Sequence, residues 1–181
     1  MASPFITARN TVTSADVATA RLGPRFGRMD LTSQLALLAV EPFAAHFDSI
    51  PRERIAICLA ARAGSLSTDA EYWKGRDAAG GLSPTLFTYT LPSAAIGEIA
   101  IRHRLTGPSL CFVGGGDELL AEASDLISRG ETDGCVCVFA NVVSPRLAEM
   151  IPAAPAASAH AFFVRRGEPH DAANTSGIEL V

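Results

Sequence analysis

Lysine is nearly absent from this sequence. Lys74 is the only lysine among 181 residues, charged residues make up 19%, and the net charge of -4 is spread over both signs. Without a basic stripe, neither nucleic acid nor an anionic membrane is an expected partner. No apolar stretch approaches the ~20 residues that a spanning helix needs, and no secretory leader pattern opens the chain. The sequence therefore predicts a cytoplasmic protein.

A cysteine-based metal or redox site is also missing. Cys58, Cys111, Cys135 and Cys137 all lie in apolar segments, where free cysteine packs as a small hydrophobe. Cys135 and Cys137 are two residues apart, so they share one side of a predicted strand and do not form the CxxC spacing of a zinc or redox site. We expect four reduced thiols, and neither a metal nor another cofactor.

Apolar residues are plentiful, at 48% of the chain. A chain of this length and composition buries a substantial core. No linker or internal repeat divides it, so residues 1–181 are expected to form one domain, with a loosely ordered tail from about residue 168.

The apolar pattern alternates between strand and helix periods. Strands are expected at 3–12, 54–62, 109–113, from about 134, and at 159–167. Helices are expected after a cap at Asp30, after a cap at Ser67 or Thr68, at 93–104 and from the glycines to about residue 128. Pro42 is expected to kink or end the first helix. This alternation predicts an α/β fold with a mostly parallel mixed sheet and helices on its faces.

Residues 83–91 precede the helix at 93 and are expected to be extended. Phe87, Tyr89 and Leu91 alternate there, so they are expected to form an apolar row on one side of the segment. Further along, Glu98 and Arg102 have the spacing of an ion pair on a solvated helix face.

The segment LTGPSLCFVGGGDELLAEA, residues 105–123, has a strand, three glycines and a helix start. This arrangement is used elsewhere to bind anions or to present a nucleophile. It lacks the GKS or GKT ending of a phosphate-binding loop and the GxGxxG pattern. Because Asp117 and Glu118 place negative charge at the helix start, a nucleotide site is not favoured.

Four segments, in order, resemble the β-ketoacyl synthases: RMDLTSQLALLAVEP, LFTYTLPSAAIGEIAIRHRLTGPS, DGCVCVFANVV and AFFVRRGEP. The resemblance covers most of residues 28–169. It implies the first half of a thiolase-type fold, in which two similar halves stack into five layers. Within that family, the sequence most resembles the divergent synthase-like N-terminal domains encoded in bacterial aryl-polyene and polyketide-type gene clusters.

The resemblance also marks a catalytic position. The family places its cysteine at a fixed distance after the GPS motif, and that distance leads here to Gly116, within the elbow that Gly114, Gly115 and Asp117 form around it. No catalytic residue is therefore expected. Cys111 lies five residues earlier, in the strand, where apolar surroundings raise a thiol pKa. The family's two histidine motifs belong to the second half.

These features together predict a non-catalytic ketosynthase-like subunit, in the manner of a chain length factor, for fatty-acid, polyketide or aryl-polyene biosynthesis. Its expected partners are a second copy or a ketosynthase, with an acyl carrier protein as a further partner. Candidate interface residues are Phe87, Tyr89, Leu91, Leu110 and Phe112. Two alternatives stay open: an acyl-transfer or thioester-hydrolysing enzyme that uses Ser109 and a histidine, and a split-gene remnant without activity of its own.

Overall fold

The computed structural model describes residues 4–77, 80–151 and 157–167, and the expected loose tail lies outside them. Its five-stranded sheet has the order β1-β5-β4-β2-β3. The strands are β1 (Pro4–Thr13), β2 (Ile55–Ala61), β3 (Ser109–Val113), β4 (Gly134–Asn141) and β5 (Ser158–Arg166). The pairs β4-β2 and β2-β3 are parallel, whereas β5 runs antiparallel to both β1 and β4. The mixed sheet expected from the sequence is confirmed, with β5 alone reversed among the described strands.

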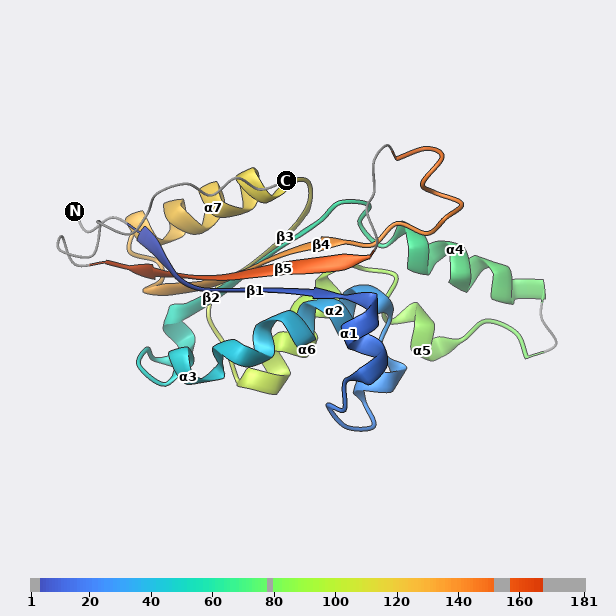
Figure 1. Ribbon diagram of the computed structural model, residues 1–181, viewed down its shortest axis with the longest axis horizontal. Coiled ribbons are helices and arrows are strands. Elements are labelled where there is room, and N and C mark those ends of the chain that lie inside the picture. Colours follow the sequence, from blue (N-terminus) through green and yellow to red (C-terminus); the bar gives the residue numbers. More distant parts are fainter. Residues whose placement is uncertain (1–3, 78–79, 152–156, 168–181) are drawn as a thin grey trace.

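Helices cover both faces of the sheet (Figure 1). They are α1 (Ser14–Thr19), α2 (Leu31–Val40), α3 (Ala44–Phe47), α4 (Leu66–Lys74), α5 (Pro84–Phe87), α6 (Ser93–His103) and α7 (Gly116–Ser128). Four short 3-10 turns lie at Phe26–Arg28, Glu41–Phe43, Arg52–Arg54 and Gly75–Asp77. Figure 1 shows α2, α3 and α6 on one side of the sheet and α7 on the other.

The two central strands explain why both faces need cover. Every residue of β2 and β4 is buried, as expected for apolar runs in the parallel part of a sheet. Alternate side chains feed two cores, one under α2 and α6 and a smaller one under α7. The smaller core contains three of the cysteines, and all four cysteines are free thiols.

The predicted start and end of α2 are both confirmed. The Asp30 side chain accepts a hydrogen bond from the backbone N–H of Ser33 at 3.0 Å, which satisfies one free donor of the first turn. The helix ends at Val40, and Pro42 lies in the 3-10 turn that follows, because proline cannot continue an α-helix.

The expected cap of α4 was wrong. Its N-cap is Ser65, and neither Ser67 nor Thr68 caps the helix. Ser67 instead accepts a hydrogen bond from the N–H of Ser144, and Thr68 donates one to Asp30. These hydroxyls join three chain segments, a use that the sequence pattern does not reveal.

The extended segment expected at 83–91 was also wrong. Ser83 accepts a hydrogen bond from Leu86 N–H and begins the short helix α5, with Pro84 in its first turn, a position that suits proline. Phe87 and Leu91 are therefore 60% and 65% exposed, whereas Tyr89 is buried at 6%. The three side chains do not form one row, because helical turns replace the strand period.

Candidate functional site

The strand, turn and helix predicted around the glycines are present: β3 leads through Gly114 and Gly115 into α7, and Gly116 is the first helical residue. Gly115 has φ -96° and ψ 178°, an extended conformation open to any residue. The positive-φ glycines of the described residues all lie elsewhere. Backbone freedom is therefore not the reason for glycine at this turn.

The carboxylate of Glu118 lies close to this turn. It folds back over the turn, where its Oε2 accepts a hydrogen bond from Gly115 N–H at 3.0 Å. A Cβ added to Gly115 would lie 2.9 Å from that oxygen, whereas one added to Gly114 would lie 3.2 Å from the Phe112 ring. The place where a helix N-terminus would bind a ligand's anion is thus taken by the chain's own carboxylate.

Neither a thiol nor a hydroxyl side chain lies at this turn, from Gly114 to Glu118. Gly116 is buried and offers none, while Asp117 is exposed beside it. Cys111 is a half-buried residue of β3, and burial raises the pKa of its thiol. The strand, turn and helix expected from the sequence are thus present, and the described side chains at the turn include no thiol or hydroxyl.

The alternative nucleophile, Ser109, lies at the other end of β3 from the elbow and is exposed. Within residues 4–77, 80–151 and 157–167, no hydrogen bond joins it to a histidine. His103 packs edge-on against Phe47, with ring centroids 5.2 Å apart, and burial lowers its pKa. His46 lies tilted against the Phe163 ring, and His160 stacks on Phe139, so each of the three described histidines packs against an aromatic ring.

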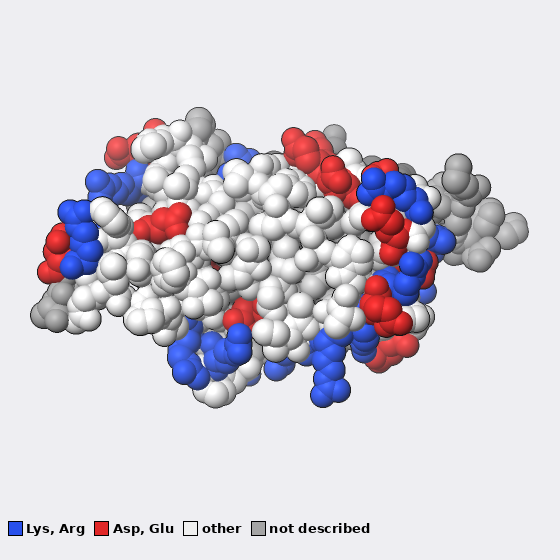
Figure 2. Space-filling view, turned by 180° about the vertical axis from the view of Figure 1, so that it is seen from behind, with Lys and Arg blue, Asp and Glu red and all other residues white. Residues whose placement is uncertain are grey.

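β3 forms an open edge of the sheet. Its residues are exposed or half-buried throughout, and Leu110 is 36% and Val113 67% exposed. Figure 2 shows the molecule from the side opposite to Figure 1, where β3 and α6 lie toward the viewer. The centre of this face is uncharged, and the charged side chains gather around its margin (Figure 2).

The predicted interface residues do not lie together in one element. Leu110 and Phe112 point to the α7 side of β3, where Phe112 packs against the smaller core. Phe87 and Leu91 are exposed on the α4–α5 side. Tyr89 is inside the protein, so it can support this surface without presenting its own side chain to a partner.

A buried carboxylate, Glu98, was not recognised from the sequence. It is 6% exposed and accepts two hydrogen bonds from Arg25, at 2.8 and 2.9 Å, and one from Tyr89 Oη at 3.0 Å. Burial, followed by the hydrogen bond to Glu98, raises the pKa of Tyr89 to about 12. The expected pair with Arg102 was wrong, because Arg102 instead donates to Glu41, in the 3-10 turn that follows α2.

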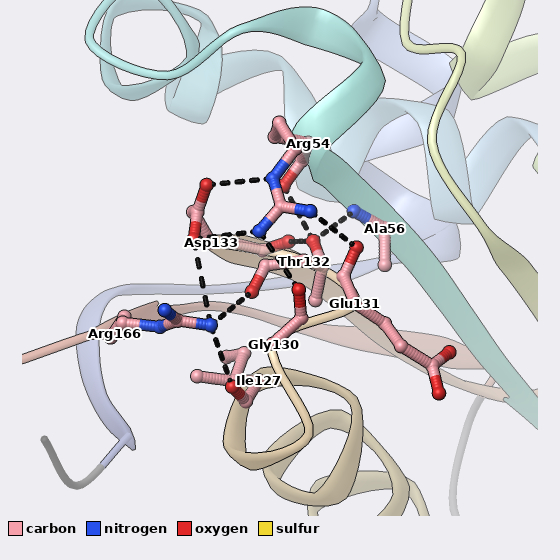
Figure 3. Close-up of polar contacts among 9 residues, drawn as sticks. Arg54, Ala56, Ile127, Gly130, Glu131, Thr132, Asp133 and Arg166 are labelled. Atoms are coloured by element: carbon pink, nitrogen blue, oxygen red, sulfur yellow. Dashed lines mark hydrogen bonds and ion pairs between the residues drawn. The ribbon is translucent and has the colours of Figure 1, made fainter. Parts of the chain in front are cut away.

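A second polar cluster, also missed, anchors the far end of α7 (Figure 3). Arg54 donates to both carboxylate oxygens of Asp133, at 2.8 and 3.0 Å, and to the carbonyls of Gly130 and Glu131. Arg166 donates to the carbonyl of Ile127 at 2.9 Å. These arginines satisfy carbonyls at and after the helix C-terminus and complement its negative end.

Thr132 lies at the centre of this cluster (Figure 3) and is fully buried. Its hydroxyl accepts from Ala56 N–H at 3.2 Å and is close enough to donate to the carbonyls of Arg54 and Gly134. One side chain thus joins the starts of β2 and β4. In the sequence, Thr132 belongs only to the short polar loop ETDG. That pattern does not reveal hydrogen bonds to residues more than 70 positions away.

We expect Asp133→Asn to remove part of the stability at neutral pH. The hydrogen bonds from Arg54 hold the pKa of Asp133 below its ordinary value of 3.8. A lowered carboxyl pKa stabilises the fold above that ordinary value, and the contribution is lost as the pH falls through the lower, folded-state pKa. Urea unfolding should therefore separate variant from wild type at pH 7, with a smaller gap at pH 3. Asp77→Asn, at an exposed position, is the control; a gap independent of pH would contradict this.

One hollow of about 420 Å³ lies where α2, α4 and α5 meet the loop after β4. Its lining is mainly apolar, from Leu31, Leu86, Val142 and Pro145, with Asp30 at one side. No metal-holding group of three His, Cys, Asp or Glu residues occurs in the part of the chain that the structure describes. Among these residues, no helix has the length and apolar character to cross a bilayer.

No family model and no curated protein matches the sequence. Solved structures do match. The ishigamide ketosynthase/chain length factor superposes with a TM-score of 0.76 at 20% identity, over 92% of this chain and 63% of that one. A ketosynthase in complex with its chain length factor from Xenorhabdus doucetiae gives 0.71 at 19%, over 93% of this chain and 81% of that one.

Two further structures agree with this result. A β-ketoacyl synthase from Burkholderia phymatum has a TM-score of 0.69 at 14% identity, covering 98% of this chain and 62% of that one. A type II polyketide acyl carrier protein in complex with its ketosynthase gives 0.75 at 16%, covering 95% and 64%. The chain spans under two thirds of three of these four structures. It has the ketosynthase and chain length factor fold, which confirms the fold expected from the sequence.

Proposed function

We propose that this protein is a non-catalytic ketosynthase-like subunit that acts by associating with a second chain along β3. The observation that carries the proposal is the elbow: the position for a nucleophile is Gly116, and the Glu118 carboxylate occupies the adjacent helix N-terminus. A condensing enzyme needs a thiolate and oxyanion donors at such a terminus. Asp117 and Glu118, in the first turn of α7, disfavour both a thiolate and an oxyanion there, because all of these groups are negatively charged.

The association part of the proposal rests on the β3 edge. An unpaired, uncharged strand edge pairs readily with another chain, and β3 has neither lysine nor proline between Ser109 and Val113. Two of the similar structures are described as a ketosynthase with its chain length factor, which supports a subunit that works in a pair. The pathway would be fatty-acid, polyketide or aryl-polyene biosynthesis, with a ketosynthase or a second copy as partner.

The outer side of α7 argues against the alternative in which a second thiolase half covers this helix. Asp117, Glu118, Glu122 and Asp125 are exposed along it, and the apolar residues point inward to the sheet. A layer packed between two sheets would be apolar on both sides. α7 instead suits contact with water.

We expect the purified protein neither to condense nor to decarboxylate malonyl thioesters on acyl carrier protein. Gly116→Cys alone should not restore either reaction, because Asp117 and Glu118 disfavour a thiolate there and the resemblance assigns the family's two histidine motifs to the second half. The test is product formation by mass spectrometry, beside an active ketosynthase as positive control. Condensation by the wild type would overturn the non-catalytic proposal.

The introduced thiol provides a separate measurement. Its alkylation rate against pH should give a pKa that is not well below the free value of ~8.5. Adding Asp117→Ser and Glu118→Ser to Gly116→Cys should lower it, because the helix N-terminus then favours negative charge without competition. Equal pKa values in the two variants would mean that the acidic pair does not control the elbow.

A further inference from the structure

We propose that the hollow at the start of α2 binds a small apolar ligand that carries a positively charged amine. The hollow has a volume of about 420 Å³ and lies between α2, α4, α5 and the loop after β4. Among the described residues that line it, none belongs to β3 or to the glycine elbow. The inference therefore goes beyond the proposed function and does not depend on it.

Hydrogen bonds between different elements hold the walls of the hollow in place. Thr68, on α4, donates to Asp30 Oδ2 at 2.7 Å. Ser67 Oγ accepts from Ser144 N–H at 2.9 Å and donates to the Val142 carbonyl at 3.3 Å. These bonds fix α4 against α2 and against the loop after β4, which passes beside α4 (Figure 1). A site whose walls are already positioned loses less entropy when a ligand binds.

Most of the lining is apolar and comes from four parts of the chain. The apolar lining residues are Leu31, Leu86, Val142, Val143, Pro145 and Ala157. Covering this surface with an apolar ligand is favourable, because it removes apolar area from water. Small-molecule sites in proteins have volumes of roughly 300–1,000 Å³, mainly apolar walls and a few polar groups at defined positions. The hollow has each of these properties, so the body of its ligand should be apolar.

The charged groups that line the hollow are both acidic, Asp30 and Glu71, and the described lining includes no lysine, arginine or histidine. Glu71 is exposed and already pairs with Lys74 at 2.5 Å. Asp30 has no ion pair with a described residue, and its two hydrogen bonds come from Ser33 N–H and the Thr68 hydroxyl. A carboxylate or phosphate ligand would meet like charge here, which is unfavourable. A cationic group is complementary to this lining.

Asp30 can accept further hydrogen bonds from a ligand. A carboxylate has about four lone-pair positions, and the bonds from Ser33 and Thr68 use one on each oxygen. The N-terminus of α2 offsets only part of the negative charge, since it is equivalent to roughly half an elementary charge. An ammonium in the hollow can donate to the remaining positions, and the apolar walls strengthen its attraction to the carboxylate by lowering the local dielectric constant.

Three probes of similar size and different charge test this assignment: phenethylammonium, phenethyl alcohol and phenylacetate. Each is titrated at pH 7 into methyl-labelled protein, and NMR follows the methyl signals of Leu31, Leu86, Val142 and Val143. We expect the ammonium to bind about tenfold more tightly than the alcohol, because a charge-assisted hydrogen bond is roughly twice as strong as a neutral one. Phenylacetate should bind most weakly. Equal affinities for the three probes, or no saturable shift of these methyl signals with the ammonium, would overturn the proposal.

Asp30→Asn removes the charge and keeps the structural contacts. Asparagine is as good an N-cap as aspartate, and the Thr68 hydroxyl can accept from the new amide as well as it donates to the carboxylate. The affinity for the ammonium should fall about tenfold, to that for the alcohol, because only the charge-assisted part of the bond is lost. Binding of the alcohol should not change. Asp125→Asn, at an exposed position of α7, is the matched control and should affect neither probe.

Val143→Phe provides a second variant that leaves Asp30 intact. The larger side chain fills part of the hollow, so it should weaken binding of both the ammonium and the alcohol, while circular dichroism confirms that the variant folds. Unchanged binding in Val143→Phe would place the ligand elsewhere, and a preference for the ammonium that survives Asp30→Asn would show that another group recognises it. Either result refutes the site and leaves the proposal for β3 as it stands.

Discussion

Leu110→Lys is expected to convert the associated protein into a folded monomer. Leu110 is partly exposed on the open edge strand, so the lysine can reach water in the monomer. In the associated protein it would lie within the β3 interface without a counter-charge. An unpaired charge in an interface costs roughly 2–5 kcal/mol, and about 1.4 kcal/mol changes a dissociation constant tenfold. We therefore expect Kd to rise by ~100-fold, measured by light scattering over a dilution series.

Met150→Lys is the matched control, since Met150 is 76% exposed and lies outside β3. It should leave the dissociation constant unchanged. Circular dichroism and thermal unfolding establish that both variants fold. If Leu110→Lys remains as associated as the wild type, β3 is not the interface, whatever the activity assays show.

Thr132→Val is expected to lower the free energy of unfolding by about 2 kcal/mol. Valine has nearly the shape of threonine, but it leaves Ala56 N–H and the carbonyl of Gly134 without the hydroxyl that joins them. A buried polar group that loses its partner costs roughly 1–3 kcal/mol. Because Thr132 is fully buried, water cannot replace the hydroxyl. Urea unfolding at pH 7 measures the change.

Thr132→Ser separates the hydroxyl from the methyl group. Serine keeps the bonds to β2 and β4 and loses one buried methyl, so it should cost less than valine does. If serine proves the more damaging change, packing and not hydrogen bonding is the main contribution of this residue. Neither substitution should alter the dissociation constant of the β3 pair, because Thr132 lies at the other end of α7 from the elbow.

Sequence alone determined much of the framework. The apolar runs at 54–62 and 134–141 specify buried strands because they offer no polar face to water, and they became β2 and β4. Asp30 and Pro42 set the ends of α2 through local capping and ring geometry. The resemblance to the β-ketoacyl synthases places the family's nucleophile position at Gly116, counted from Gly107, and this assignment stays a prediction. All of these are local properties of the chain.

Only the tertiary structure decided the rest, because it depends on partners distant in sequence. Glu98 is solvated or buried according to whether Arg25, 73 positions away, reaches it. Thr132 gains its importance from Ala56, 76 positions away. The helical spacing predicted Arg102 as the partner of Glu98, but Arg102 pairs with the carboxylate of Glu41. The glycines of the elbow were recognised from the sequence. The position of the Glu118 carboxylate was not, because its hydrogen bond from Gly115 N–H forms only when the turn is folded.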